Sequence, residues 1–194
     1  DNGSEEARTH ELFATLVRDV RVRILPMPGP FNYSRLNNRA AAEAQGEVLL
    51  LLNNDTEVIE PGWMREMVSH AVRPEIGAVG CKLLYANGRV QHAGVVLGIG
   101  WPGGVAGHYF AGALGEAAGP FGLLALARSA SAVTAACLAV RKCLYEQVGG
   151  LDEENLPVAF NDVDLCLRIR EQGYRNLWTP FAVLYHHESV SRGS

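Results

Sequence analysis

The sequence predicts an α/β domain in which helices flank a mixed, mainly parallel sheet. The prediction depends on three consecutive segments: residues 20–25 (VRVRIL), residues 34–45 and residues 47–52 (EVLLLL). Their patterns indicate a strand, a helix and a second strand, and this order is typical of a parallel sheet covered by helices. The chain has 194 residues, enough for a hydrophobic core, so residues 1–194 are treated as a single domain.

Each of these three elements has a local signature. Residues 20–25 alternate apolar and basic side chains, which indicates a strand with one solvated face. Ser34 is a suitable N-cap for a helix that continues to about Gln45, and Gly46 suits the position after its end. The apolar run 47–52 follows directly, and so short a run indicates a central strand buried on both faces.

The rest of the chain continues the alternation of helices and strands. We expect helices over residues 61–72 and 162–172, a short helix or turn over residues 145–154, and strands over residues 76–85, 89–98, 132–140 and 176–185. Residues 98–120 differ, because they carry many glycines, few charges and no clear period. A loop of this length in a compact domain is usually functional or disordered, and we interpret it as a lid over a binding site.

Composition excludes several classes of protein. Hydrophobic residues make up 48% and charged residues 20% of the chain, as in ordinary soluble domains. The formal net charge of −4 argues against a non-specific nucleic-acid binder but allows a small phosphorylated ligand. No apolar run approaches the ~18 residues of a membrane span. The four cysteines form no C-x-x-C pair, so a structural zinc site is not indicated.

The first candidate site is the run Asn53, Asn54 and Asp55, which follows the predicted strand 47–52. Polar side chains at the carboxyl end of a parallel strand lie where open α/β sheets bind ligands. Asp55 is a hard oxygen ligand suited to Mg²⁺ or Mn²⁺, and a metal held by one carboxylate keeps positions open for a diphosphate. Asn and Asp are also common turn formers, so a plain turn stays an alternative.

Two further candidates lie near the end of the chain. Asp162 and Asp164 stand at a predicted helix start, where negative charge is favourable. Capping or a salt bridge explains Asp164, whereas Asp162 follows an apolar run and could take a proton from a hydroxyl at a cleft edge. His186 and His187 end the last strand, and neighbours on a strand point to opposite faces. One imidazole could therefore bind Mn²⁺, with a structural role as the alternative.

The order of these motifs resembles the family 2 glycosyltransferases, whose fold is of the GT-A, Rossmann-like type. The resemblance rests on residues 1–4 (DNGS), 31–58 (FNYSRL to NNDTEV), 149–154 (GGLDEE), 160–175 (FNDVDLCLRIREQGYR) and 185–193 (YHHESVSRG). It covers nearly the whole chain. The chain is most similar in character to bacterial enzymes that build O-antigen, rhamnan and other surface polysaccharides.

The resemblance implies roles on the chemical side of the site. Asp55 matches the carboxylate that bridges Mg²⁺ or Mn²⁺ to the diphosphate of a nucleotide-sugar donor. Asp162 matches the catalytic base. His186, or else His187, matches the histidine on the metal side.

It also implies roles on the nucleotide side. Asp1 matches an aspartate that contacts the nucleotide base. Asn38 matches a position near the nucleotide cleft, with Arg35 one helical turn before it. Asn53 replaces the first acidic residue of the family motif, near the ribose, and Asn54 lies beside it.

The activity implied by the resemblance is an inverting, metal-assisted single displacement. The donor is a nucleotide-diphosphate sugar, and the acceptor is a saccharide or a lipid-linked glycan. The expected location is the cytoplasm, including the inner face of the membrane through peripheral association. A sugar-nucleotide pyrophosphorylase and a degenerate, non-catalytic binding module are the alternatives.

The resemblance further leads us to expect a chain truncated at its N-terminus. The family begins with a strand and helix of roughly 30 residues that precede the part matched by residues 1–4. Without them the nucleotide pocket should be incomplete. The exposed sheet edge could then pair with a second copy of the chain.

Overall fold

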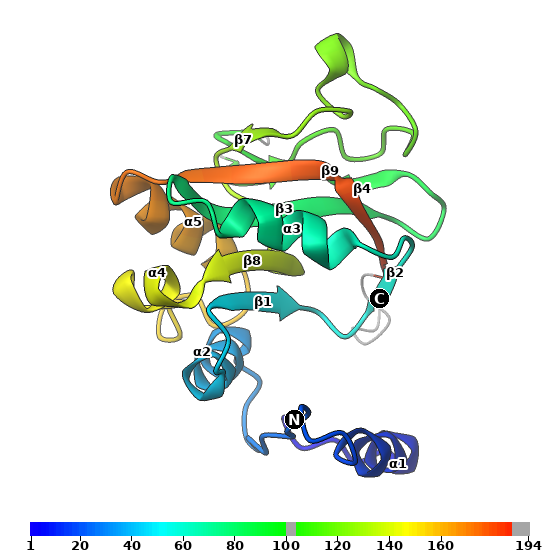
Figure 1. Ribbon diagram of the computed structural model, residues 1–194, viewed down its shortest axis with the longest axis vertical. Coiled ribbons are helices and arrows are strands. Elements are labelled where there is room, and N and C mark those ends of the chain that lie inside the picture. Colours follow the sequence, from blue (N-terminus) through cyan, green and yellow to red (C-terminus); the bar gives the residue numbers. More distant parts are fainter. Residues whose placement is uncertain (100–103, 188–194) are drawn as a thin grey trace.

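The computed structural model describes residues 1–99 and 104–187, and in these ranges a mixed sheet lies between helices (Figure 1). The strands are β1 Val48–Leu52, β2 Thr56–Val58, β3 Ile76–Leu84, β4 Val90–His92, β5 Val95–Leu97, β6 Ala106–His108, β7 Arg128–Ala130, β8 Cys137–Arg141 and β9 Arg175–His186. The helices are α1 Ala7–Leu16, α2 Tyr33–Glu43, α3 Trp63–Ala71, α4 Lys142–Gln147 and α5 Asn161–Glu171, with a 3₁₀ turn η1 at Pro120–Gly122.

The main sheet has seven strands in the order β1-β8-β3-β9-β2, with β4 paired to β3 and β7 paired to β9. Strand β3 is its centre, and all nine of its residues are buried. Among the described strands, β3 and β9 form a parallel pair, while every other pair of this sheet is antiparallel. The predicted α/β class with a mixed sheet is therefore confirmed, but the expectation of a mainly parallel sheet is wrong.

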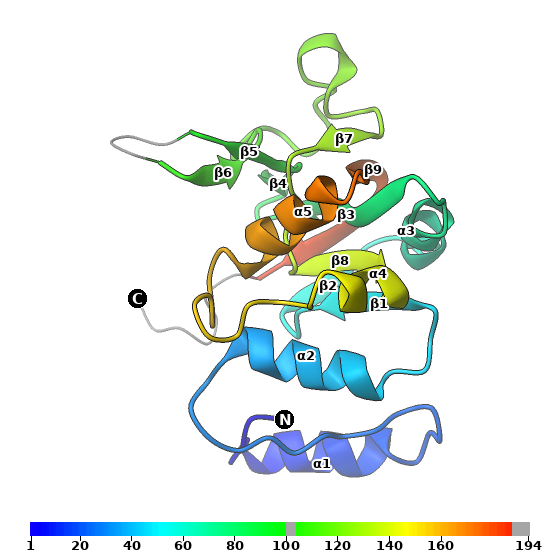
Figure 2. The same cartoon turned by 90° about the vertical axis from the view of Figure 1, so that its left-hand side faces the viewer.

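Helices cover both faces of the sheet, and each face has its own core (Figure 2). On one face α3 buries Trp63, Met67 and Ala71 against β3, β8 and β9. On the other face α5 packs its apolar side, which includes Leu165 and Ile169, into a larger core. Helix α2, and beyond it α1, lies past the β1 edge (Figure 2). The helices predicted over residues 61–72 and 162–172 are therefore confirmed.

Two predictions near the β1 edge are wrong: the strand over residues 20–25 is absent, and the strand over residues 47–52, although present as β1, is not central. Residues 20–25 form turns and irregular chain, and Val20 is 95% exposed. Their alternating pattern needs a neighbouring strand to supply hydrogen bonds, and none of the described strands lies beside them. Strand β1 is not central, because β8 is its one described neighbour and its burial alternates, with Leu49 and Leu51 inside and Leu52 43% exposed.

Helix α2 begins slightly earlier than predicted and has a different cap. The side chain of Asn32 accepts a hydrogen bond from the backbone N–H of Arg35 at 2.8 Å and so caps the helix. Ser34, the predicted cap, is buried inside the first turn and donates to the carbonyl of Leu156 at 2.6 Å. The hydrogen bond of Ser34 ties the helix start to the segment that precedes α5.

The predicted loop over residues 98–120 is partly ordered, and its residues 100–103 lie outside the described ranges. The described part contains β6 and the start of η1, and it projects from the sheet (Figure 1). Cations from the sheet side hold it, since Lys82 donates to the carbonyl of Gly115, and Arg89 donates to that of Gly112 at 2.7 Å. No helix in the described part of the chain is both long and apolar enough to cross a membrane.

Candidate functional site

The turn after β1 presents Asp55. The backbone N–H of Asn53 donates to the carbonyl of Ala136 at 2.9 Å, which holds the strand end against the start of β8. The hydroxyl of Thr56 donates to the carbonyl of Asn53 at 2.8 Å and closes the turn. Asn54 lies at its exposed tip. The turn is thus real, as the alternative interpretation held, and it directs the Asp55 side chain inward.

Asp55 and His186 face each other across the sheet edge. Strands β2 and β9 pair antiparallel and bring the residues that flank them together. Nε2 of His186 lies 3.1 Å from Oδ1 of Asp55, and the two side chains are 12% and 26% exposed. Asn53 completes the group, with its Nδ2 at 3.4 Å from the same imidazole nitrogen. The structure therefore brings His186 next to Asn53 and Asp55, which lie 133 and 131 positions earlier in the chain.

This pair fits a divalent cation. Oδ1 of Asp55 is buried and accepts no hydrogen bond, even though a ring nitrogen approaches it. A buried carboxylate oxygen without a donor is costly unless a cation satisfies it. Within the described ranges, no group of three or more His, Cys, Asp or Glu side chains could hold a metal ion. The pair would therefore supply two ligands and leave the remaining positions to oxygens from a substrate or from water.

His187 takes a different partner from His186. Its Nε2 lies 3.0 Å from Oε2 of Glu57, a side chain that is 66% exposed. Its backbone N–H donates to the carbonyl of Asp55 at 2.8 Å. Of the two candidate histidines, the geometry thus gives His186 the place beside Asp55, and His187 supports the turn from outside.

Asp162 lies in the first turn of α5, with both oxygens oriented by backbone N–H groups. Oδ2 accepts from Ala135 at 3.0 Å and Oδ1 accepts from Val163 at 2.8 Å. The preceding Asn161 is buried, and its Nδ2 donates to Oγ of Ser34 at 2.9 Å, so its amide has a structural role. The carboxylate of Asp162 is therefore held in one orientation, with lone pairs left for a further donor.

One short backbone segment joins these groups. The N–H of Thr134 donates to Nε2 of His92 at 3.4 Å, and the N–H of Ala135 donates to Asp162. The carbonyl of Ala136 accepts from Asn53. Residues 134–136 therefore fix the Asp162 side and the Asp55 side relative to each other.

Tyr33 is a site residue that the sequence did not reveal. Its hydroxyl donates to the carbonyl of Ala135 at 2.9 Å. Burial raises the pKa of Tyr33 well above its ordinary value, and the negative charges of Asp162 and Asp55 raise it further. The two carboxylates are thus within electrostatic range of one neutral hydroxyl, at the start of α2.

His92 is a second unpredicted residue at this end of the sheet. It is fully buried, and burial lowers its pKa well below the ordinary value, with smaller effects from His108, Arg128 and His186. Its ring is therefore neutral at physiological pH. Nδ1 of His92 lies 2.8 Å from Nδ1 of His108, and the N–H groups of Gly94 and Thr134 donate to its Nε2.

Asp1 and Arg35, two predicted nucleotide-side residues, make their side-chain hydrogen bonds with residues near them in the sequence. Oδ1 of Asp1 accepts from the backbone and hydroxyl of Ser4 at 3.0 and 2.6 Å. Arg35 donates to the carbonyl of Pro30 at 2.9 Å, and its buried Nε has no hydrogen-bond partner. Their hydrogen bonds go to these neighbours and not to Asp55. Contact with a nucleotide stays a prediction for both.

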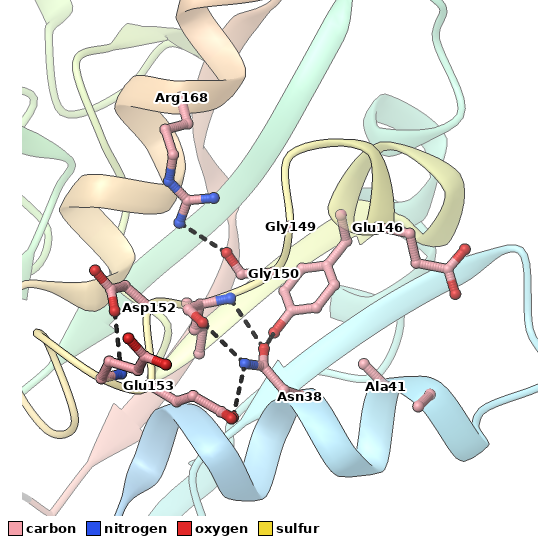
Figure 3. A pocket seen from close by; sticks show the side chains of 12 residues that line it. Asn38, Ala41, Glu146, Gly149, Gly150, Asp152, Glu153 and Arg168 are labelled. Atoms are coloured by element: carbon pink, nitrogen blue, oxygen red, sulfur yellow. Dashed lines mark hydrogen bonds between the residues drawn. The ribbon is translucent and has the colours of Figure 1, made fainter.

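Asn38 uses its whole amide to join α2 to the turn after α4 (Figure 3). Its Nδ2 donates to the carbonyl of Leu151 at 2.8 Å, and its Oδ1 accepts from the Tyr145 hydroxyl at 2.6 Å and from the Leu151 N–H at 2.9 Å. These bonds give Asn38 a structural role, and a nucleotide contact stays a prediction.

A cavity of about 700 Å³ lies beside Asn38. Acidic side chains dominate its polar lining, namely Glu146, Asp152, Glu153 and Glu154, and none of the three candidates Asp55, Asp162 and His186 lines it. Its one cationic side chain, Arg168, is paired with Asp164 at 2.6 Å. Because acidic walls repel a diphosphate, we do not assign the donor to this cavity.

Gly150 is a position where an added side chain should destabilise the fold. Its φ is +68°, and a Cβ there would lie 2.6 Å from Oδ1 of Asn38. Replacing Gly150 with alanine should therefore cost about 2 kcal/mol and lower the melting temperature by about 4–8 °C. Gly149→Ala is the matched control, since its φ is +84° but a Cβ would meet nothing within 4 Å. Equal melting temperatures for the two variants would contradict the packing role of Asn38.

Comparison with known proteins agrees with the motif order. Residues 5–192 match the model of the family described as "Glycosyltransferase like family 2". The chain is 55% identical over its full length to protein y4gI of Sinorhizobium fredii (strain NBRC 101917 / NGR234), covering 21% of that protein. It is 46% identical, over 97% of its length, to the O-antigen biosynthesis protein RfbC of Myxococcus xanthus, covering 15% of it. The chain thus spans about a fifth or less of these two relatives.

A more distant relative and a solved structure extend the comparison. The chain is 28% identical, over all of its residues and 66% of the relative, to the N-acetylglucosaminyl-diphospho-decaprenol L-rhamnosyltransferase of Mycobacterium tuberculosis (strain ATCC 25618 / H37Rv). A mannosyltransferase from Pyrobaculum calidifontis, solved with GDP-mannose and Mn²⁺, superposes with a TM-score of 0.67 at 16% identity, covering all of this chain and 47% of that one. At this identity the likeness shows the fold alone, which is of the GT-A type.

Proposed function

This chain belongs to glycosyltransferase-like family 2, and from that premise we propose that it transfers a sugar from a nucleotide-diphosphate sugar to a hydroxyl acceptor by an inverting single displacement. Its place in cell-surface polysaccharide synthesis is supported by the relative named for O-antigen biosynthesis. The acceptor is a saccharide or a lipid-linked glycan, as in the name of the mycobacterial relative. The proposed location is the cytoplasm, including the inner face of the membrane.

The proposal is carried by one observation: Oδ1 of Asp55 is buried, accepts no hydrogen bond and lies opposite Nε2 of His186. Together they offer one hard oxygen, which suits Mn²⁺ or Mg²⁺, and one imidazole nitrogen, which favours Mn²⁺. When bound there, the cation would neutralise charge on the departing nucleotide diphosphate. Asn53 contributes a neutral amide beside this pair, so it adds hydrogen bonding but no charge.

Asp162 is the proposed base. The N–H groups of Ala135 and Val163 hold its carboxylate still, and the remaining lone pairs can accept the proton of an acceptor hydroxyl. Inversion requires the attacking oxygen and the leaving group to lie on opposite faces of the sugar. The base Asp162 and a cation held at Asp55, on the two sides of the segment 134–136, would meet that requirement.

The two alternatives are less well supported. The family match favours sugar transfer over the nucleotidyl chemistry of a pyrophosphorylase. A non-catalytic binding module would have no need for an unpaired buried carboxylate oxygen at Asp55. Asn161, the residue before the proposed base, has a structural partner in Ser34.

The proposal can be tested on the protein with a panel of UDP-, GDP- and dTDP-linked hexoses. We expect turnover of one donor, dependent on Mn²⁺ or Mg²⁺ and abolished by EDTA. Proton NMR of the product at early times should show the anomeric configuration opposite to that of the donor. Retained configuration would contradict the single displacement. Turnover that persists in EDTA would contradict the metal role, and absence of turnover with every donor would favour a binding module.

A further inference from the structure

Gln91, on the short strand β4, reaches the ring of His186 from the side opposite Asp55. Oε1 of Gln91 lies 2.7 Å from Nδ1 of His186, and Nε2 of Gln91 donates to the His186 carbonyl at 3.4 Å. Gln91 is 4% exposed and the His186 side chain is 12% exposed. A buried glutamine thus holds both the ring and the backbone of one histidine.

These two contacts determine which ring nitrogen carries the proton. The backbone carbonyl of His186 is an acceptor only, so the amide nitrogen of Gln91 must face it. The amide oxygen of Gln91 then faces Nδ1, and an oxygen facing a ring nitrogen at 2.7 Å requires a proton on that nitrogen. Nδ1 of His186 is therefore the protonated nitrogen.

In the neutral imidazole the other nitrogen, Nε2, then carries a lone pair. Two neighbours agree with this assignment: Nδ2 of Asn53 approaches Nε2 as a donor at 3.4 Å, and Oδ1 of Asp55 lies 3.1 Å away without accepting a hydrogen bond. Two electron-rich atoms that face each other at this distance need a cation between or beside them.

We propose that Gln91 is a positioning residue that keeps His186 in the Nδ1–H form, so that the Nε2 lone pair and the Asp55 carboxylate together face a divalent cation. The inference rests on the proposed function, since it assigns a determinant of cation affinity at the same site. Hydrogen bonds to the second nitrogen of a ligating histidine commonly fix its tautomer and orientation.

The other tautomer of His186 would block the cation site, which is why a residue is needed to hold the Nδ1–H form. With the proton on Nε2, His186 would donate to Asp55 and close the site to a cation. Nδ1 would then turn a lone pair toward the oxygen of Gln91 inside a buried environment, which costs the desolvation of both groups. Removing Gln91 removes that penalty, so the closed form should become the favoured one.

The tautomer can be measured directly by ¹⁵N–¹H NMR of the histidine rings in the full, metal-free chain, with His186→Gln identifying the signals. We expect His186 to be protonated at Nδ1 in the wild type and mainly at Nε2 in Gln91→Leu. Gln91→Glu retains an acceptor for the Nδ1 proton, so it should restore the wild-type tautomer. Gln147→Leu, at an exposed glutamine, is the control substitution.

Cation affinity is the second readout, measured by EPR titration with Mn²⁺ alone. Gln91→Leu should weaken Mn²⁺ binding about 10- to 100-fold, and Gln91→Glu should recover it. An Nε2–H form in the wild type would overturn the inference. Unchanged Mn²⁺ affinity in Gln91→Leu, together with weakened binding in Asp55→Asn, would also overturn the inference. The proposed metal site would stand in that case. If Asp55→Asn also leaves Mn²⁺ affinity unchanged, the metal assignment of the proposed function fails with it.

Discussion

Replacing Asp162 with asparagine will lower the turnover of sugar transfer by about 10²- to 10⁴-fold and leave the dissociation constant of the donor nearly unchanged. Asparagine has almost the same shape, and its one oxygen can still accept from the N–H of Ala135. It cannot take a proton from the acceptor hydroxyl. The loss should therefore appear in kcat, measured on the full-length protein, and not in the affinity for the donor measured by calorimetry.

Asp164→Asn is the matched control for this experiment. Asp164 lies in the same first turn of α5, but its carboxylate pairs with Arg168 at 2.6 Å. Its loss should lower stability slightly and leave kcat intact. Equal losses of kcat in both variants would mean that turnover depends on negative charge at the helix start and not on a base at Asp162. Full turnover in Asp162→Asn would require another base.

Helices α2, α3 and α5 and the inner strands were predictable because their signals are local. The helical spacing of α3 and α5 and the apolar runs of β3 and β9 are each sufficient to define the element. The failures concern strands whose state depends on a partner. Residues 20–25 have the alternation of a strand, but alternation cannot supply the neighbour that a strand requires. Strand β1 has the composition of a central strand and lies at an edge.

The candidate site was predictable in its ionisable residues and not in what holds them. Asp55, Asp162 and His186 were found because the order of three motifs along the chain is informative. The segment 134–136 binds through backbone N–H and C=O groups, which every sequence has, so no residue type marks it. Gln91 gave no signal either, because a lone glutamine in a strand is ordinary until its neighbour is known.

The second large effect is expected at Asp55. Replacing Asp55 with alanine should weaken Mn²⁺-dependent donor binding about 10- to 100-fold, since the site loses its one hard anionic ligand. Isothermal titration of the donor with and without Mn²⁺ measures this directly. In the absence of metal, Asp55→Asn should be as stable as the wild type or more stable, because the variant no longer buries a carboxylate oxygen without a hydrogen bond.

Thermal unfolding with and without Mn²⁺ then separates the metal role of Asp55 from a role in the turn alone. A ligand that binds the folded state raises the melting temperature, so the wild type should gain stability with Mn²⁺ and donor, and Asp55→Asn should not. Glu57→Gln is the matched control, because Glu57 also faces an imidazole, His187 at 3.0 Å, but is 66% exposed. It should keep the Mn²⁺ effect. A turn role alone predicts the reverse for Asp55: Asp55→Asn would lose stability without metal and keep the response to Mn²⁺.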